Sequence, residues 1–550
     1  MSRSAYSLAP DGMNSPKKSP GKKPSGKSRS TKRRRVTDQG GRGQPAPEVV
    51  PEDASRSDLL AAAKRQGIEH RSEMSNDELR TSLAARGDDV GVSEWPASRF
   101  EAFELLARAS ARGEFVMLPR MLCGDDRRRH VRQTLREDHQ TRIARNDLEA
   151  QRKFDKLAGS LFSFFRGTAL LFYRDMAGQD AWMPTVMSLG DVHPANFGVM
   201  PNEDGVAIFG VNDFDESAYA PFTWDLKRGA TGFLIAAEVE GQKPKNRRRI
   251  VRSFVRGYIE QIRTYATRNT EGEEQTRIDN APKMIAKLIK NALESRAKWL
   301  ADDYLNEYGT GFRNTDELVP ISRRREEFQD LVDAWVKKNE IAVPERAISR
   351  NGTGEMVVKD VAMRRGQGTA SLGLPRYYVM IEGPNADGTD DLIIEFKQAR
   401  RSALHGLVPP TTFNGEVMGE RVVHAHEVQL VRGDVFFGSI DFEDKSFLSR
   451  ERPPFKDDVD LEELSKKGWR KYARICGHAL AQAHALSDDM GSLDYDVEPA
   501  ILKAIEPEDL FVGDITRYAK EAAARVRRDH KAFREDHARR AFENIDIAYR

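Results

Sequence analysis

The alternation of apolar and polar positions divides the chain into a largely helical first part, a middle part rich in strands and glycine, and a helical end. Apolar residues recur at helical spacing between residues 247 and 266, as expected for a helix packed on a core. Short apolar runs of strand character follow at residues 357–363, 376–382 and 391–397. Helical spacing returns at residues 415–430, 469–484 and 515–545. This order predicts an α+β fold.

Two acidic segments each follow a predicted strand, at residues 190–196 and 212–216. Their key residues are Asp191, Asn196 and Asp213. Asp191 can accept a proton from a hydroxyl group, while Asn196 and Asp213 offer hard oxygen ligands for Mg²⁺ bound to a triphosphate. Either segment alone is also typical of a plain β-turn. Together, at this spacing, they favour phosphoryl transfer.

Four neighbouring residues are candidates for supporting roles. His193 and Asp215 lie within the acidic segments, and Arg166 ends an aromatic run at residues 159–167. A guanidinium beside an acidic site can orient a carboxylate or bind phosphate. Asp225 falls in the first turn of a predicted helix, where it can favour the helix dipole or hold the backbone of the catalytic loop.

A glycine-rich turn and a lysine predict where a nucleotide would bind. Gly366, Gly368 and Gly373 lie between the first two predicted strands, and glycine lets backbone N–H groups approach phosphates closely. Lys397 stands within an apolar strand, as does the kinase lysine that pairs with phosphates and with a helix glutamate. A surface lysine with a buried stem is the alternative. The next helix offers Glu416, Glu420 and Glu427 as partners; the sequence does not choose among them, and Glu420 is the weakly preferred one.

Composition limits the possible classes of protein. The chain has 88 Lys and Arg against 86 Asp and Glu, so a preference for charged partners must come from local patches. Two cysteines exclude a disulfide scaffold and a cysteine zinc cluster. No apolar run approaches the roughly 18 residues that cross a bilayer. We therefore expect a cytoplasmic protein without a membrane partner.

The N-terminal region differs from the rest in composition. Residues 17–35 hold ten Lys or Arg and no acidic residue, which predicts a disordered basic tail over residues 1–52. Such a tail binds nucleic acid through counterion release, or merely keeps the protein soluble. Residues 55–86 predict a capped helix-loop-helix module that resembles the SAP and Rho N-terminal modules. That resemblance implies DNA or RNA binding; a protein-docking hairpin is the alternative.

Several motifs together resemble one bacterial family. They are GDVHPANFG, NDFDESAYAPFTWDLKR, FFRG, RRGQGTASLGLPRYYVMIEG, EFKQARRSAL, GERVV and CGHALAQAHALS. This combination is similar to the family known as domain of unknown function 2252 (DUF2252), over roughly residues 100–545. That family is in turn similar to aminoglycoside phosphotransferases and other protein-kinase-like enzymes, whose loops read His-Gly-Asp-x-His-x-x-Asn and Ile-Asp-Phe.

The resemblance implies roles for four residues. Asp191 matches the catalytic Asp, Asn196 and Asp213 match the metal ligands, and Asp225 matches the Asp that steadies the catalytic loop. Leu189 stands where the family pattern has its first His, so how this chain anchors the loop is an open question at the sequence level.

The order of the parts differs from that of ordinary kinases, because Lys397 follows Asp191 instead of preceding it. We interpret this as a circularly permuted, two-lobed protein-kinase-like fold. Residues 97–345 would begin the catalytic lobe, residues 350–450 would form the nucleotide-binding lobe, and residues 460–550 would complete the catalytic lobe. Contacts rather than chain order define a site, so the permutation is compatible with activity.

The sequence thus predicts an ATP- and Mg²⁺-dependent phosphotransferase acting on an unknown acceptor. One alternative is a catalytically weak kinase-like scaffold, or a nucleotidyl-transferring enzyme, targeted to nucleic acid by residues 1–86. A metallophosphoesterase fits less well, because Gly190-Asp191-x-His193 is not followed by the further metal-ligand motif of that class.

Overall fold

The computed structural model describes residues 55–65, 75–76, 79, 98–145, 148–350, 354–366, 374–408, 418–455 and 459–543. Two compact units divide the chain, one over residues 1–95 and one over residues 96–550. In the first unit, α1 (Arg56–Arg65) buries Leu59 and Ala63, and Leu79 is buried as well. The amide of Leu79 donates to the carbonyl of Ser75, the helical bond expected where a second helix starts. The rest of the basic tail and of this module lies outside the described residues.

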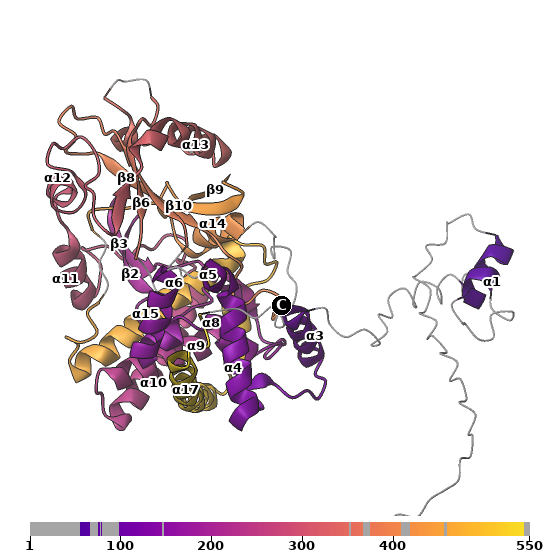
Figure 1. Cartoon of the computed structure of the whole chain (residues 1–550). Helices are drawn as coiled ribbons and strands as arrows, with labels where there is room; N and C mark the ends of the chain where they lie inside the picture. The colour runs from indigo at the N-terminus through magenta and orange to yellow at the C-terminus, as the bar shows by residue number, and fades with distance from the viewer. Residues whose placement is uncertain are drawn as a thin grey trace, which may run out of the picture. The chain divides into compact units, whose positions relative to one another are not determined.

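The second unit is a mixed α+β structure (Figure 1). The earlier helices are α3 (Arg99–Ala111), α4 (Gly124–Asp138), α5 (Gln140–Arg145), α6 (Leu148–Gly159), α7 (Leu161–Arg166), α8 (Ala169–Arg174), α9 (Phe222–Val239) and α10 (Pro244–Arg268). The later helices are α11 (Lys283–Ala292), α12 (Arg296–Trp299), α13 (Arg325–Lys338), α14 (Met418–Gln429), α15 (Lys466–Asp489), α16 (Val497–Ala504) and α17 (Glu508–Ala538).

Two small antiparallel strand pairs and one larger sheet make up the described strands. The antiparallel pairs are β1 (Thr185–Ser188) with β4 (Ala218–Pro221), and β2 (Phe197–Pro201) with β3 (Ala207–Val211). The six-stranded sheet has the order β5-β6-β7-β8-β10-β9. Its strands are β5 (Leu318–Pro320), β6 (Val358–Arg364), β7 (Arg376–Ile381), β8 (Leu392–Gln398), β9 (Gly438–Phe442) and β10 (Lys445–Glu451). The three strands predicted from the apolar runs are confirmed as β6, β7 and β8.

The six-stranded sheet reaches further toward the N-terminus than its expected start near residue 350. β5 pairs with β6, and α13 packs its apolar face, including Phe328 and Trp335, on the sheet residues Val379 and Phe396. β5 was not among the strands predicted from the sequence. A three-residue edge strand is too short to show a period of two, which is why the sequence pattern does not reveal it.

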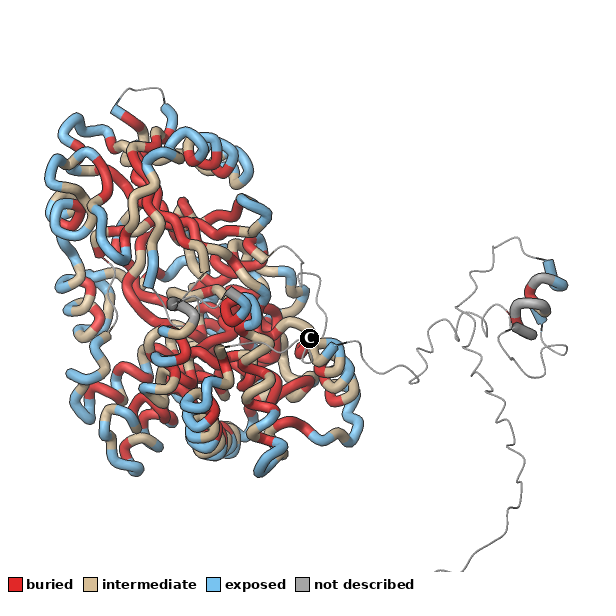
Figure 2. The backbone as a smooth tube through the Cα atoms, viewed as in Figure 1, coloured by how far each residue is buried: buried red, intermediate tan, exposed pale blue. Residues whose placement is uncertain are grey.

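Helices form the other end of the second unit, and α10 and α15 pack closely there (Figure 1). A Cβ on Gly257 would lie 2.4 Å from the carbonyl oxygen of Arg474, and one on Gly477 would lie 2.3 Å from that of Phe254. Only glycine at both positions permits so close an approach. Figure 2 shows buried residues continuing from this helical end into the strands. The largest apolar core spans α9, α10 and α15, so the helix predicted at residues 469–484 belongs to the same core as the acidic segments.

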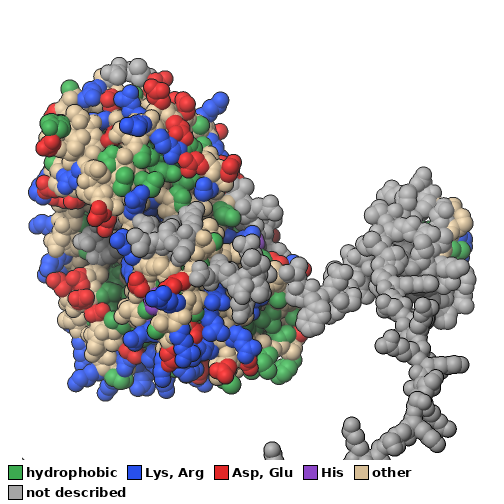
Figure 3. Space-filling model, viewed as in Figure 1, with side chains coloured by type: hydrophobic (Ala, Val, Ile, Leu, Met, Phe, Trp, Pro, Cys, Tyr) green, Lys and Arg blue, Asp and Glu red, His purple; other side chains and the backbone are tan. Residues whose placement is uncertain are grey.

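The charges of the nearly neutral chain are unevenly spread over the surface. Figure 3 shows Lys and Arg side chains gathered over the helical end of the second unit. Within the described residues, no helix is both long enough and apolar enough to cross a membrane.

Candidate active site

The two acidic segments lie next to each other because both connect the β1–β4 strand pair to the β2–β3 strand pair. The first segment connects β1 to β2, and the second connects β3 to β4. The amide of Asn212 donates to the carbonyl of Asn196 at 3.2 Å, and Ser217 Oγ donates to the carbonyl of Leu189 at 3.3 Å. The two segments, each of which follows a strand, therefore lie side by side.

Gly190 lets the first segment turn tightly against the second. Its φ is +80°, and a Cβ there would lie 2.2 Å from the carbonyl oxygen of Glu216. Any other residue would force the two segments apart. This glycine directly precedes Asp191, so the turn determines where that carboxylate points.

Asp191 is buried and is held by an arginine. Arg228 Nε, on α9, donates to Asp191 Oδ1 at 2.7 Å, and the Arg228 side chain is itself fully buried. Asn196 Nδ2 donates to the backbone carbonyl of Asp191 at 2.7 Å. His193 Nε2 lies 3.7 Å from Asp191 Oδ2. The guanidinium that holds the Asp191 carboxylate is thus Arg228, a residue of the quoted NDFDESAYAPFTWDLKR motif whose role the sequence did not reveal.

Arg166 contacts His193, whereas Arg228 contacts Asp191 directly. Its Nε is 3.3 Å from His193 Nε2, and its guanidinium carbon is 5.8 Å from the centre of the Phe162 ring. Burial, together with the positive charges of Arg166 and Arg228, holds the pKa of His193 well below its usual range. His193 is therefore neutral at physiological pH. It lies between the Arg166 guanidinium and the Asp191 carboxylate.

Burial and the neighbouring charges have opposing effects on the pKa of Asp191. Burial raises the pKa of Asp191 to about 6, Arg228 opposes that rise, and the negative charges of Glu216 and Asp213 add to it. A carboxylate with a pKa near neutrality suits proton transfer, because it both ionises at working pH and accepts a proton readily.

Asp225 anchors the loop that carries Asp191. Its carboxylate accepts the backbone N–H of Leu189 at 2.6 Å and that of Gly190 at 3.0 Å. His484 Nε2 lies 3.0 Å from the same carboxylate, and its Nδ1 lies 2.9 Å from Tyr258 Oη. All three side chains are buried.

This anchor answers the question raised by Leu189. The histidine on the anchoring Asp comes from α15, within the quoted motif CGHALAQAHALS, instead of from the residue before Gly190. The role predicted for Asp225, holding the backbone of the loop, is the one its hydrogen bonds display. The part played by His484 depends on a contact between distant segments, so the sequence alone did not indicate it.

Lys397 reaches the second acidic segment from the six-stranded sheet. Lys397 Nζ forms an ion pair with Asp215 Oδ2, and both side chains are largely buried. Lys397 on β8 therefore lies beside the segment that contains Asp213. On the same strand, Glu395 accepts hydrogen bonds from Arg376 Nη1 at 2.7 Å and from Arg450 Nε at 2.5 Å.

The partner of Lys397 differs from the one expected. Glu420 lies 3.2 Å from Lys338 instead, Glu427 is exposed, and Glu416 lies outside the described residues. The α14 residue that reaches the second segment is Arg421, which donates to the carbonyl of Asp215 at 2.7 Å. The helix was predicted correctly, but its rotation, which selects the inward residue, is set by packing on β9 and β10.

The glycine-rich turn is described only at its start. Gly366 follows β6 with a φ of +74°, a left-handed conformation that favours glycine. Gly368 and Gly373 lie outside the described residues.

A small cavity lies between the β2–β3 pair and the segment that leaves β10. Its lining includes Val199, Met200 and Asn212 on one side and Arg450 and Arg452 on the other. Arg450 also feels the negative charge of Asp213, so this cavity and the acidic segments share one electrostatic environment.

The donors at the site suit a hard cation. Asn196 uses its Nδ2 to hold the Asp191 carbonyl, so its Oδ1 is available as a ligand. Asp213 is partly exposed and offers carboxylate oxygens next to Asn212, whose amide is bonded to Asn196. Amide and carboxylate oxygens are the ligands that Mg²⁺ prefers. Asn196 and Asp213 would therefore hold the metal.

Comparison with protein families gives one match. The family described as "Uncharacterized protein conserved in bacteria (DUF2252)" matches residues 145–536. This range contains both acidic segments, Lys397 and His484. A search of curated proteins and a search of solved structures each give no match.

Proposed function

Since this chain belongs to the DUF2252 family, a family without an assigned activity, we propose a function from the site itself: an ATP- and Mg²⁺-dependent phosphotransferase with a circularly permuted, kinase-like fold. The observation that carries the proposal is the anchored loop. Asp225 and His484 fix the backbone at Leu189 and Gly190 and so place Asp191 beside Asn196 and Asp213. The acceptor is unknown.

The arrangement of the lobes supports the permutation. α15, which carries His484, comes late in the chain but packs beneath a loop formed much earlier. The sheet that carries Lys397 lies between these two parts in sequence and reaches the same loop region through Asp215. In this proposal the catalytic lobe of the enzyme is assembled from two separated stretches of chain.

Each residue then has a defined task. Asp191 would take the proton of the acceptor hydroxyl, and Arg228 orients its carboxylate. Lys397 would move from Asp215 to the nucleotide phosphates, with Gly366 opening the turn that covers them. The cavity bounded by Val199 and Arg452 is the place where a base could enter.

A binding experiment tests this assignment. Lys397→Ala should weaken ATP binding in the presence of Mg²⁺ about tenfold or more, because a charge-assisted phosphate contact is lost. Asp213→Asn should make ATP affinity independent of Mg²⁺. Calorimetric titration of ATP with and without Mg²⁺ measures both effects.

Lys338→Ala is the matched control, since Lys338 is a partly exposed lysine paired with Glu420. Its affinity for ATP should equal that of the unaltered protein. Equal losses for Lys338→Ala and Lys397→Ala would mean that Lys397 has no special place in the site.

We further propose that residues 1–86 bring the protein to nucleic acid, the charged-partner role suggested by the basic tail. Deleting residues 1–50 should leave the melting temperature nearly unchanged and weaken binding to duplex DNA or RNA at low salt, because these cations act through counterion release. Fluorescence anisotropy at two salt concentrations measures the loss. Unchanged binding would remove the tail from the functional account.

A further inference from the structure

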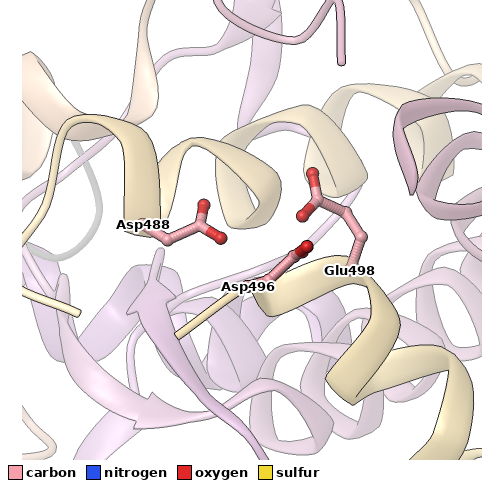
Figure 4. A group of neighbouring side chains, drawn as sticks. All are labelled: Asp488, Asp496 and Glu498. Carbon is pink, nitrogen blue, oxygen red and sulfur yellow. The ribbon is translucent and has the colours of Figure 1, made fainter. Parts of the chain in front are cut away.

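A second group of carboxylates lies at the C-terminal end of α15. Asp488 is in the last turn of α15, Asp496 immediately precedes α16, and Glu498 is in the first turn of α16. One carboxylate oxygen from each lies within 4.8 Å of the others. Figure 4 shows the three side chains reaching toward one another from the two helices.

A fourth carboxylate, Glu271, is buried against this group. Glu271 is 2% exposed and Glu498 is 4% exposed, and Glu271 Oε2 and Glu498 Oε1 each lack a hydrogen-bond donor among the described residues. Glu271 interacts with Glu498 and feels the negative charges of Asp488 and Asp489. Glu498, a member of the group, thus buries a carboxylate oxygen that no donor among the described residues reaches, and Glu271 buries a second such oxygen beside it.

The described residues supply little positive charge to balance these acids. Within that part of the chain, no Lys, Arg or His forms an ion pair with Glu271, Asp488, Asp496 or Glu498. The amide of Val497 donates to Asp488 Oδ2 at 2.7 Å. Asp496 is exposed and Asp488 is partly buried, whereas Glu271 and Glu498 are both buried. Burying two carboxylates together is costly unless a cation or a shared proton compensates them.

We propose that Glu271, Asp488, Asp496 and Glu498 bind a divalent cation, with Ca²⁺ as the best match. All four ligands are carboxylates from three separate segments, and Ca²⁺ accepts six to eight oxygens in irregular geometry. The negative end of the α15 dipole adds to the attraction. Nitrogen and sulfur ligands, which zinc prefers, are not among the four.

The position of the site gives the cation a structural task. His484, which binds Asp225, lies one helical turn before Asp488 on α15. A cation joining Asp488 to Glu271 and Glu498 would fix the end of α15 and with it the histidine of the anchor. This consequence rests on the proposed function, whereas cation binding itself does not.

Thermal unfolding of the full-length protein tests the site. After removal of metals with EDTA and of the EDTA by dialysis, Ca²⁺ at about 100 times its dissociation constant should raise the melting temperature by about 3 °C. The measurement uses the Asp213→Asn background without nucleotide, so that the proposed Mg²⁺ site does not contribute. Calorimetry should give one Ca²⁺ per chain.

Matched variants identify the ligands. Glu498→Gln and Asp488→Asn should each abolish the Ca²⁺-induced shift, whereas Asp494→Asn, an exposed acid in the same loop, should retain it. The competing state is a proton shared by Glu271 and Glu498, since burial raises the pKa of Glu498 to about 8. Absence of a shift with Ca²⁺ would overturn the proposal in favour of that protonated pair. An equal shift in Glu498→Gln would overturn it by placing the cation elsewhere.

Discussion

Replacing Asp191 with asparagine is expected to lower phosphoryl transfer by roughly 10² or more, the scale of a lost general base, while ATP and Mg²⁺ still bind. The substitution removes the carboxylate that faces the acceptor but neither proposed metal ligand. Asp213→Asn, made in the same site, should instead lose both Mg²⁺-dependent binding and transfer. Transfer rate and ATP affinity, measured for both variants, separate chemistry from binding.

The variant needs a stability control, because Asp191 compensates a fully buried guanidinium. Asparagine can accept one hydrogen bond from Arg228 but does not neutralise it, so some loss of stability is expected. Melting temperature and ATP binding show whether the protein is folded in the assay. A folded Asp191→Asn variant with full transfer activity would mean that another group accepts the proton.

The pH dependence provides a check with a definite sign. Burial raises the pKa of Asp191 to about 6, and the carboxylate acts as a base only when ionised. Transfer should therefore increase as the pH rises through about 6 and then level off. The same rise in Asp191→Asn would assign it to a different group.

The second large effect is expected at the anchor. Asp225→Asn should destabilise the protein by about 3 kcal/mol and reduce transfer strongly, because a buried carboxylate that accepts the N–H groups of Leu189 and Gly190 and contacts His484 is lost. An asparagine offers a single acceptor oxygen and turns an N–H group toward one of these donors. Denaturant unfolding and transfer assays measure the two losses.

Tyr258→Phe is the graded control. It removes only the hydroxyl beside His484 Nδ1, so a loss of about 1 kcal/mol is expected, with the loop itself still held by Asp225. If Asp225→Asn and Tyr258→Phe had equally small effects on stability and transfer, the anchor would not control the position of Asp191.

Local patterns allowed much of the fold and part of the site to be predicted. Strands β6, β7 and β8 stand out as short apolar runs, and helix α15 has apolar residues at helical spacing. Asp225 was recognisable as an acid in the first turn of a helix directly after the second segment. These features depend on residues close together in sequence, so they can be recognised from the sequence alone.

The contacts that the sequence did not predict join residues that are far apart in the chain. Lys397 pairs with Asp215 because the end of β8 meets the second segment, and α14 turns Arg421 instead of Glu420 toward it. Arg228 and His484 were visible in the motifs, but their partners come from the packing of α9 and α15. The kinase-like description of the whole fold stays a prediction that these contacts support.

We propose that the anchored site transfers the terminal phosphoryl group of ATP. The most direct measurement incubates the purified protein with Mg²⁺ and a bacterial extract, once with ATP labelled at the γ-phosphate and once at the α-phosphate. We predict an extract component labelled from the γ-phosphate alone, with the label absent for Asp191→Asn. Label from the α-phosphate would indicate adenylate transfer, and no label from either position would contradict the assignment as a phosphotransferase.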